Sequence, residues 1–322
     1  PINTYLQSTQ DDSPYEGKFP GMSTSTFPVK TSEMISGGLG LLTATPFGSS
    51  LTLEFARAAI ESEQLGSDDI TDLLAVSISS TDYVGHRFGP NSIEVEDTYL
   101  RLDRDLAKFF IYLDDKMGKG NYSIFLTADH GAINNVNFLL DNKASAGSLA
   151  TKDWISILNS QFEQEYKVKN IVLTYSNTQI SLNNAVIAAS KINEIEIKSK
   201  VVQLLNQQEG VAYAFDIQNV ATVPIPEIYR AKVINSYNRE RSGVIQVIPK
   251  PGWTEGGTFG GTHGTIGHYD THIPLLFMGW GIKHGESKSA YAMTDIAPTI
   301  TSLLKIQEPN GTIGKPIIEV FK

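Results

Sequence analysis

The hydrophobic residues of this chain recur with two periods, which together predict helices alternating with strands. The clearest helical pattern runs from residue 91 to residue 120, where large side chains recur at steps of three and four and therefore share one face. These side chains are Val95, Tyr99, Leu102, Leu106, Phe109, Leu113 and Met117. Asn91 with Glu94 three residues later fits a capping box at the start of this helix, and Gly118 or Gly120 fits its end.

Two short, continuous apolar runs flank the helix. One is DLLAVSISS, residues 72–80, and the other is YSIFLTA, residues 122–128. Runs of this kind are typical of strands that are covered on both faces of a sheet. Because a long helix separates them, the segment predicts a βαβ unit with parallel strands.

The rest of the chain has shorter patterns of both kinds. We expect helices at 49–66, 154–166, 192–211 and 294–306, strands at 243–249 and 272–280, and a hairpin at 170–183 with Ser176-Asn177 in its turn. The first 45 residues are rich in Ser, Thr, Gly and Pro and are expected to form loops. The sequence thus predicts an α/β fold in a single domain over residues 1–322, with an inserted subdomain at about 150–240.

Composition restricts the possible functions. A net charge of −9 argues against electrostatic binding to nucleic acid, because phosphate neutralisation requires clustered Lys and Arg. No window approaches the ~20 apolar residues that span a bilayer. The absence of cysteine excludes disulfides, thiolate zinc sites and Cys nucleophiles, so a transition metal would need His, Asp or Glu ligands. The sequence starts at Pro1 without an initiator Met or a signal-like run, from which we expect a processed, cut or engineered N-terminus.

Residues that can hold a metal lie next to the expected strands. Asp82 and His86 follow the first strand, Asp129 and His130 follow the second, and His263 precedes the strand at 272–280 in a glycine-rich loop. Because the carboxyl ends of parallel strands share one edge of a sheet, we expect Asp82, His86, Asp129 and His130 to converge there. Zn²⁺ accepts His nitrogen and Asp oxygen, and two zinc ions ~3.5–4 Å apart can clamp both oxygens of a phosphoryl transfer.

Each of these features also has an ordinary structural interpretation. Asp82 with His86 is compatible with loop capping, and Asp129-His130 with the chemistry of a turn. His263 is compatible with a solvated side chain, and the glycines between 256 and 264 with either flexibility or close backbone approach to a ligand. Other catalytic motifs are missing, because the sequence contains no G-x-S-x-G elbow, no Walker loop and no G-x-G-x-x-G at a strand-to-helix turn.

Four stretches, taken together, resemble one family. They are STDYVGHRFGPNSIEVEDTYLRLDRDL, FLTADHGA, GGTHGTIGHYDTHIPLLFMGWGI and TDIAPTITSLL. Their order, D-x-x-x-H, D-H, H-G and D-I-A-P-T, resembles that of the alkaline phosphatase superfamily, most of all the PafA-type bacterial enzymes related to the nucleotide pyrophosphatase/phosphodiesterase group. The resemblance extends from about Thr45 to the C-terminus and implies a three-layer αβα sandwich with a mostly parallel central sheet.

The resemblance implies ligands for two zinc ions. Asp82, His86 and His263 match the three ligands of the first zinc, which activates the nucleophilic water. Asp129 and His130 match two ligands of the second, which holds the catalytic hydroxyl.

The other histidines near the C-terminus, and Asp270, are not expected to be zinc ligands. His263 is preferred to His268 and His272 because the third ligand of the family is a His directly followed by Gly. His268, Asp270 and His272 are therefore expected to support the ligands, and His284 is expected to be solvated.

The resemblance also implies missing parts. In this family the second zinc takes a further Asp and a nucleophilic Thr or Ser, and neither has a counterpart between Pro1 and Thr45. We therefore expect about the C-terminal three fifths of a two-zinc phosphate monoester hydrolase, without a catalytic nucleophile and inactive alone. Its expected partners are a phosphate ester and the missing N-terminal segment of the same protein. Neither nucleic acid nor a membrane is an expected partner. The expected location is the periplasm or outside the cell. A phosphodiesterase or nucleotide pyrophosphatase, or a non-catalytic metal-binding module, stays open as an alternative.

Overall fold

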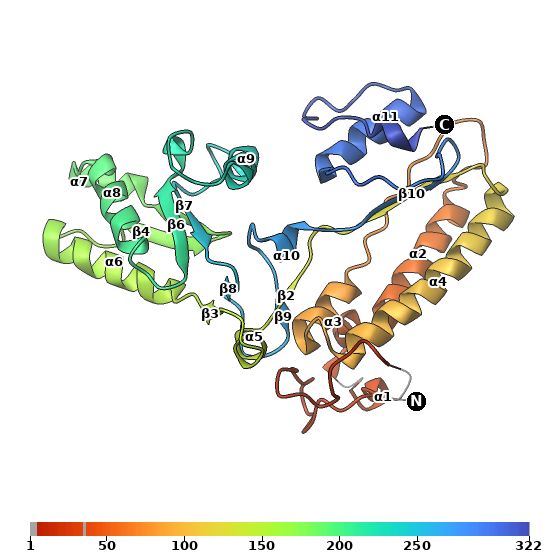
Figure 1. Ribbon diagram of the computed structural model, residues 1–322, viewed down its shortest axis with the longest axis horizontal. Helices are drawn as coiled ribbons and strands as arrows, with labels where there is room; N and C mark the ends of the chain where they lie inside the picture. Colours follow the sequence, from red (N-terminus) through yellow and green to blue (C-terminus); the bar gives the residue numbers. More distant parts are fainter. Residues whose placement is uncertain (1–4, 35–36, 322) are drawn as a thin grey trace. The chain divides into compact units, whose positions relative to one another are not determined.

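The computed structural model describes residues 5–34 and 37–321, so Pro1, where the sequence begins, lies outside it (Figure 1). The chain divides into two compact units, each assembled from three stretches. Unit 1 consists of Pro1–Gly48, Ser79–Tyr99 and His130–His272, and unit 2 of Ser49–Ile78, Leu100–Asp129 and Ile273–Lys322.

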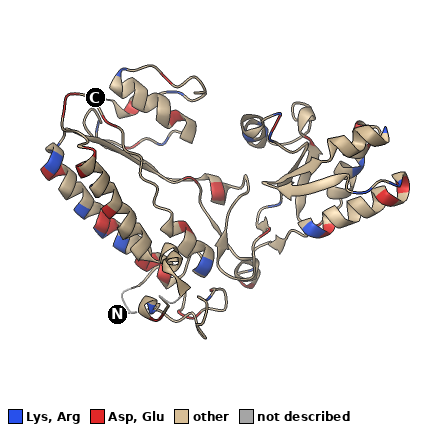
Figure 2. Ribbon diagram, turned by 180° about the vertical axis from the view of Figure 1, so that it is seen from behind, with Lys and Arg blue, Asp and Glu red and all other residues tan. Residues whose placement is uncertain are grey.

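Two long helices run side by side in the same direction, α2 (Pro46–Ser62) and α4 (Ile93–Met117) (Figure 1). Ser50 Oγ donates to Asp105 Oδ2 at 2.5 Å, and seven residues further along each helix the Arg57 guanidinium lies 4.6 Å from the centroid of the Tyr112 ring. The exposed positions of α4 carry charges of both signs, as expected for an amphipathic helix (Figure 2). Both expected helices are confirmed.

The start of α4 differs from the expected capping box. The helix begins at Ile93, and Ser92 Oγ accepts a hydrogen bond from the Val95 amide at 3.3 Å. Glu94 does not reach back to the chain before the helix but is buried, with 5% of its surface exposed. A serine adjacent to the first turn has replaced Asn91 as the capping residue.

Strands β1 (Ser123–Thr127) and β10 (Leu275–Gly279) confirm two of the expected strands. They pair antiparallel, with Phe125 opposite Phe277. The strand expected at 72–80 is wrong for the described chain, because residues 71–78 belong to no helix or strand and Ser80 opens a helix. The expected parallel pairing with β1 is absent from the described residues for the same reason, and Leu73 there is 71% exposed.

The largest sheet lies in unit 1 and has the order β4-β5-β7-β6, with every pair antiparallel. Its strands are β4 (Val172–Ser176), β5 (Gln179–Leu182), β6 (Val211–Asp216) and β7 (Ile245–Pro249). The expected hairpin is confirmed, but its turn is Asn177-Thr178, one residue later than expected. Both residues have positive φ, 49° and 60°, as a tight two-residue hairpin turn of type I′ requires.

Helices α6 (Thr151–Tyr166) and α8 (Glu194–Leu205) pack on this sheet and confirm two further expectations (Figure 1). Trp154, Leu158 and Phe162 of α6 recur at steps of four residues and are almost completely buried. They form the largest apolar cluster of the described chain together with the inner side chains of α8 and of the sheet. The assignment of about 150–240 to an inserted subdomain stays a prediction.

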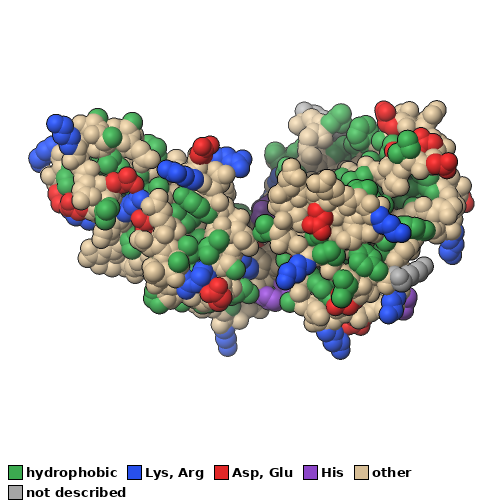
Figure 3. Space-filling view, turned by 90° about the horizontal axis from the view of Figure 1, so that it is seen from above, with side chains coloured by type: hydrophobic (Ala, Val, Ile, Leu, Met, Phe, Trp, Pro, Cys, Tyr) green, Lys and Arg blue, Asp and Glu red, His purple; other side chains and the backbone are tan. Residues whose placement is uncertain are grey.

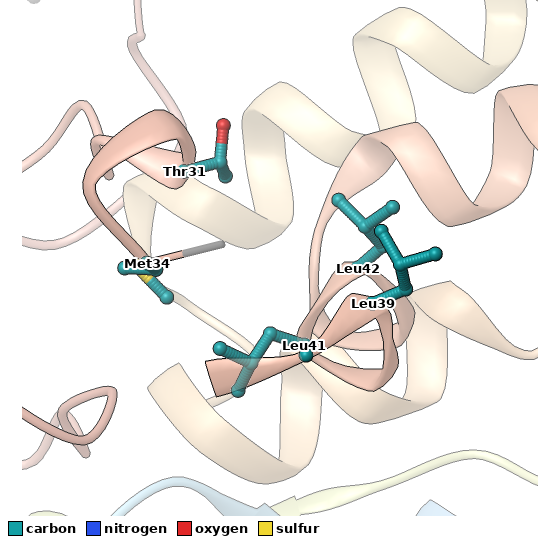
Figure 4. Close-up of a pocket in the computed structure, with 6 residues that line it drawn as sticks. Thr31, Met34, Leu39, Leu41 and Leu42 are labelled. Carbon is teal, nitrogen blue, oxygen red and sulfur yellow. The ribbon is translucent and has the colours of Figure 1, made fainter. Parts of the chain in front are cut away.

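The first part of the chain folds around α3 (Ser80–Phe88). Phe19, Val84 and Phe88 are buried in one apolar cluster, against which residues of α1 (Thr31–Met34) and of the 3₁₀ helix η3 (Leu39–Ala44) pack. Figure 4 shows the gap between Met34, Leu41 and their neighbours, and its volume of about 10 Å³ is barely that of a single water molecule. The expected loops of this region therefore include short helical turns.

The remaining elements are short. They are β2 (Ile133–Asn134), α5 (Val136–Asp141), β3 (Gly147–Ser148), α7 (Asn184–Ser190), η4 (Ile217–Asn219), α9 (Glu227–Ser236), β8 (Trp253–Thr254), β9 (Gly261–Thr262), α10 (His268–Thr271), η5 (Met293–Asp295), α11 (Ile296–Leu304) and η6 (Ile318–Val320). The pair β2–β9 is antiparallel and β3–β8 is parallel. None of the helices in the described residues is long and apolar enough to cross a membrane.

Candidate metal centre

Asp82 and His86 lie on the same face of α3, because side chains four residues apart on a helix are neighbours. The Oδ1 atom of Asp82 lies 3.3 Å from Nε2 of His86. The segment between them is helical, and a Cβ at Gly85 would meet nothing within 4 Å, so the helix itself sets the spacing.

Two glycines bring His263 to this helix. A Cβ on Gly260 would lie 1.8 Å from the carbonyl oxygen of His86, and one on Gly261 would lie 2.8 Å from Pro90. Gly260 also has a φ of +70°, which favours glycine. Glycine therefore lets this loop come close to the α3 segment at these two positions, and flexibility is not needed to explain it.

The donor atoms of the three residues form a small triangle. Nε2 of His86 and Nε2 of His263 are 3.0 Å apart, and Oδ1 of Asp82 lies 3.5 Å from Nε2 of His263. Ligand atoms ~2.0–2.2 Å from one tetrahedrally coordinated ion are about 3.3–3.6 Å from one another, so the three donor atoms are close to the spacing that a single metal ion requires and leave a fourth position open. Within the described residues, this is the one group of three or more such side chains whose ligand atoms all lie within 4.8 Å of one another.

Hydrogen bonding orients the imidazole of His86. Nδ1 of His86 lies 3.0 Å from the carbonyl oxygen of Gly261, which can only accept, so Nδ1 donates and Nε2 is the ring nitrogen that faces the other two donor atoms. Burial, followed by the neighbouring His130, lowers the pKa of His263, while Asp82 opposes the change. The lowered pKa favours the neutral form of the His263 ring.

His130 lies next to His263. The rings are stacked with centroids 3.5 Å apart and planes 15° apart, and Nδ1 of His130 lies 2.9 Å from the carbonyl oxygen of Gly131. The preceding residue, Asp129, is exposed and belongs to unit 2. The structure thus brings His130 to the edge of the triangle, and a metal-binding role for this pair stays a prediction.

The three residues expected to support the ligands differ from one another. Asp270 is buried, and its Oδ2 accepts hydrogen bonds from the amide and the hydroxyl of Thr265 at 2.6 and 2.8 Å. Its backbone oxygen accepts from the amide of Gly131 at 2.8 Å, which ties the His130 loop to the His263 loop. His268 and His272 are exposed, with ring centroids 4.7 Å apart, and neither belongs to the triangle.

A pocket of about 940 Å³ opens beside His86. Its wall includes Tyr83, Arg87, Lys18 and Phe259, which places two aromatic rings and two cations next to the triangle. This volume lies in the range of small-molecule sites. These residues could not be predicted from the sequence, because no periodicity or motif distinguishes an exposed aromatic ring beside a site from any other one.

Comparisons with known proteins identify the family of the chain. The sequence model of the family described as "Type I phosphodiesterase / nucleotide pyrophosphatase" matches residues 3–272. The alkaline phosphatase PafA of Elizabethkingia meningoseptica and a protein of Myroides odoratus named calcium-transporting ATPase are each 48% identical to this chain over its whole length. The chain spans 59% and 60% of their respective lengths.

The fold is shared as well. The crystal structure of wild-type alkaline phosphatase PafA superposes with a TM-score of 0.96 and 48% identity, over the whole of this chain and 62% of that protein. The expected α/β fold is thereby confirmed. The chain belongs to the type I phosphodiesterase/nucleotide pyrophosphatase family within the alkaline phosphatase superfamily, and its relatives there include PafA-type alkaline phosphatases.

Proposed function

We propose that this chain is the metal-binding part of a two-zinc phosphate monoester hydrolase. Asp82, His86 and His263 hold one zinc ion in this proposal, while Asp129 and His130 contribute to a second. The observation that carries the proposal is the triangle of donor atoms at 3.0, 3.3 and 3.5 Å, of which two distances lie in the range expected around one zinc ion and the third is slightly shorter. A zinc ion there would act as a Lewis acid and lower the pKa of bound water.

The residues of the chain prepare this site before any ion binds. The hydrogen bond to Gly261 orients the ring of His86, and Asp82 supplies the negative charge that a divalent ion requires. The pocket beside His86 has room for the organic part of an ester, with Tyr83 and Phe259 as apolar contacts. We assign the organic group of the phosphate ester to this pocket.

Zinc titration tests the proposal. Calorimetry and metal analysis of the unaltered chain should give at least one bound zinc ion, and Co²⁺ in its place should give the absorption spectrum of a tetrahedral site. His86→Ala and His263→Ala should each lose this ion because each removes one of three ligands. His284→Ala, which changes an exposed histidine of unit 2, is the matched control and should retain it. Equal losses in all three variants would contradict the assignment.

We also propose that the chain is inactive alone and acts with the N-terminal part of the same protein. It spans about three fifths of the length of its relatives, and the resemblance assigns the nucleophile to the part that has no counterpart here. The test is hydrolysis of p-nitrophenyl phosphate by the chain with zinc at alkaline pH. Turnover comparable to that of a full-length relative would refute this proposal. By resemblance, we propose a periplasmic or secreted location.

A phosphodiesterase is the second candidate, because the matching family model is that of type I phosphodiesterases and nucleotide pyrophosphatases. Zinc binding is expected in both cases and does not separate them. Competition between p-nitrophenyl phosphate and bis-p-nitrophenyl phosphate in the complete protein does, since the monoesterase should turn over the monoester faster.

A further inference from the structure

Asp270 is a buried carboxylate that follows His263 in the same segment of the chain. It is 3% exposed, whereas several histidine side chains, purple in Figure 3, reach the surface of the molecule. Its Oδ2 accepts hydrogen bonds from the amide and the hydroxyl of Thr265 at 2.6 and 2.8 Å. Its Oδ1 is also buried but has no hydrogen-bond partner in the part of the chain that the structure describes. A buried carboxylate oxygen without a donor is costly, so Oδ1 is suited to a donor that is still to be identified.

The carboxylate of Asp270 lies near His263. Thr265, which donates to it, follows His263 by two residues, and two residues of backbone span at most ~7 Å. Burial is the main cause that lowers the pKa of His263, and the negative charge of Asp270 is among those that oppose this change. Both residues belong to unit 1. The two side chains therefore come from neighbouring parts of one loop.

The ring of His263 has the matching donor. Its Nε2 lies 3.0 Å from Nε2 of His86 and 3.5 Å from Oδ1 of Asp82, so Nδ1 lies on the side of the ring next to its own main chain. No hydrogen bond joins Nδ1 to any described residue. The ring of His130 is stacked on one face of this imidazole, which leaves the edge for a hydrogen bond. A histidine that binds a metal through one nitrogen commonly donates the other N–H to a carboxylate, a carbonyl or water.

We infer that Asp270 is a positioning residue of the metal centre, whose Oδ1 accepts the Nδ1–H of His263 while Nε2 of His263 binds the metal ion. The inference deepens the proposed function and rests on it, because it assigns a role to Asp270 at the same triangle. A carboxylate in this position fixes the orientation and the tautomer of the ring. It also makes Nε2 a stronger ligand.

The main chain of Asp270 acts on the loop of His130. Its carbonyl oxygen accepts a hydrogen bond from the Gly131 amide at 2.8 Å. A Cβ on Gly131 would lie 2.1 Å from the carbonyl oxygen of Tyr269, so this close approach of the two loops requires glycine. Asp270 thus contacts one loop through its main chain and orients His263 through its side chain. A substitution that changes the carboxylate alone separates these two contributions.

Asp270→Asn is that substitution, because the amide keeps the shape of the side chain but has one acceptor oxygen instead of two. Either the Thr265 amide or the Nδ1–H of His263 then loses its acceptor. The dissociation constant for zinc, measured by calorimetry at pH 8, should rise roughly ten- to a hundredfold. Nuclear magnetic resonance of the zinc-loaded, ¹⁵N-histidine-labelled chain adds a spectroscopic test. The Nδ1–H signal of His263 should be protected from exchange with water in the unaltered chain and lost in the variant. That of His86, which faces the carbonyl oxygen of Gly261 at 3.0 Å, should persist in both.

Thr265→Val is the matched control in the same loop. It removes a hydroxyl that bonds to Oδ2 of Asp270, to the Tyr269 hydroxyl and to the Gly267 amide, but it leaves Oδ1 of Asp270 unchanged. Zinc affinity should therefore fall less than about threefold. Hydrogen exchange of the Gly131 amide in the zinc-free chain should be the same in Asp270→Asn as in the unaltered chain, because its acceptor is a backbone oxygen.

Two kinds of result would overturn the inference. If Asp270→Asn binds zinc within about twofold of the unaltered chain, the Nδ1–H of His263 has another acceptor. If Thr265→Val loses as much affinity as Asp270→Asn, or if Asp270→Asn speeds exchange of the Gly131 amide, Asp270 has a structural role only. Failure of the proposed function is distinguishable from both, since the unaltered chain would then bind no zinc, and the role of Asp270 would fail with it.

Discussion

Glu94 makes the stability of unit 1 fall as the pH rises. Its side chain is 5% exposed. Burial raises the pKa of Glu94 to about 8, since a backbone hydrogen bond opposes this change only in part and the nearby acidic residues Glu16, Asp11 and Asp97 add to it. Burial likewise raises the pKa of Glu16, which is 3% exposed, to about 7. The folded chain thus holds protons that the unfolded chain releases.

The sign and the size follow by linkage. Because both folded-state pKa values lie above the ordinary value of 4.5, their contribution to the free energy of unfolding is fully present below pH 4.5 and is lost as the pH rises to about 7 and about 8. At 1.36 kcal/mol per pKa unit, a change from 4.5 to about 8 corresponds to ~5 kcal/mol. Relaxation and water entry lower this value, so we expect about 3 kcal/mol for Glu94.

Glu94→Gln removes the ionisation and keeps the shape of the side chain. At pH 5 the variant and the unaltered chain should agree within about 1 kcal/mol, because the glutamic acid is then neutral as well. At pH 9 the variant should be more stable by about 3 kcal/mol. Urea denaturation at pH 5, 7 and 9 measures the difference, and hydrogen exchange of residues 80–99 assigns it to unit 1.

Glu96 provides a control of opposite sign on the same helix. Burial opposes the change, but hydrogen bonds from Ser8, Leu6 and Gln7 lower the pKa of this carboxylate. Its contribution is therefore present at neutral pH and lost as the pH falls, and Glu96→Gln should reduce stability at pH 7. If Glu94→Gln unfolds with the same dependence on pH as the unaltered chain, the carboxylate is solvated and the reasoning is refuted.

Three further predictions concern the metal centre and the core. Gly260→Ala should abolish zinc binding in a calorimetric titration, because its Cβ would lie 1.8 Å from the His86 carbonyl oxygen. Gly257→Ala is the control and should still bind zinc, because its Cβ would meet nothing within 4 Å. Leu158→Ala, at a position that is 0% exposed, should lower the free energy of unfolding in urea by about 2–5 kcal/mol, while Ile157→Ala, at 43% exposed, should cost far less. Zinc should raise the melting temperature, and EDTA should reverse this effect. A melting temperature that zinc leaves unchanged at pH 8 would contradict the site.

The elements that could be predicted from the sequence are those with partners in the chain itself. Helix α6 buries Trp154, Leu158 and Phe162 against strands of the same unit, so the face that the periodicity marks as apolar is the face that is buried. The hairpin turn lies one residue later than predicted, because the pairing of Ser176 with Gln179 leaves Asn177 and Thr178 in the turn. Positive φ is unfavourable for a β-branched residue such as Thr178, so residue preference does not reveal this register. Boundaries of this kind depend on tertiary contacts.

The candidate site was partly predictable for a different reason. The spacing of Asp82 and His86 is local, so it could be recognised without knowing the fold. The position of His263 next to them depends on Gly260 and on a backbone contact between residues 174 apart in the chain, since Gly260 approaches His86. Glu94 was assigned to a cap and is in fact buried, because a charged residue in the first turn of a helix has the same sequence signature in both environments.

The segment 72–78 shows why one predicted strand was wrong. Its apolar residues describe a strand with cover on both faces, yet Leu73 and Val76 are 71% and 38% exposed in the described chain. Such a pattern would be destabilising in a protein that left it in water, because exposed apolar side chains gain nothing from folding and promote aggregation. The mismatch shows that an apolar run records the environment to which a segment is suited, and the described part of the chain does not supply that environment for residues 72–78.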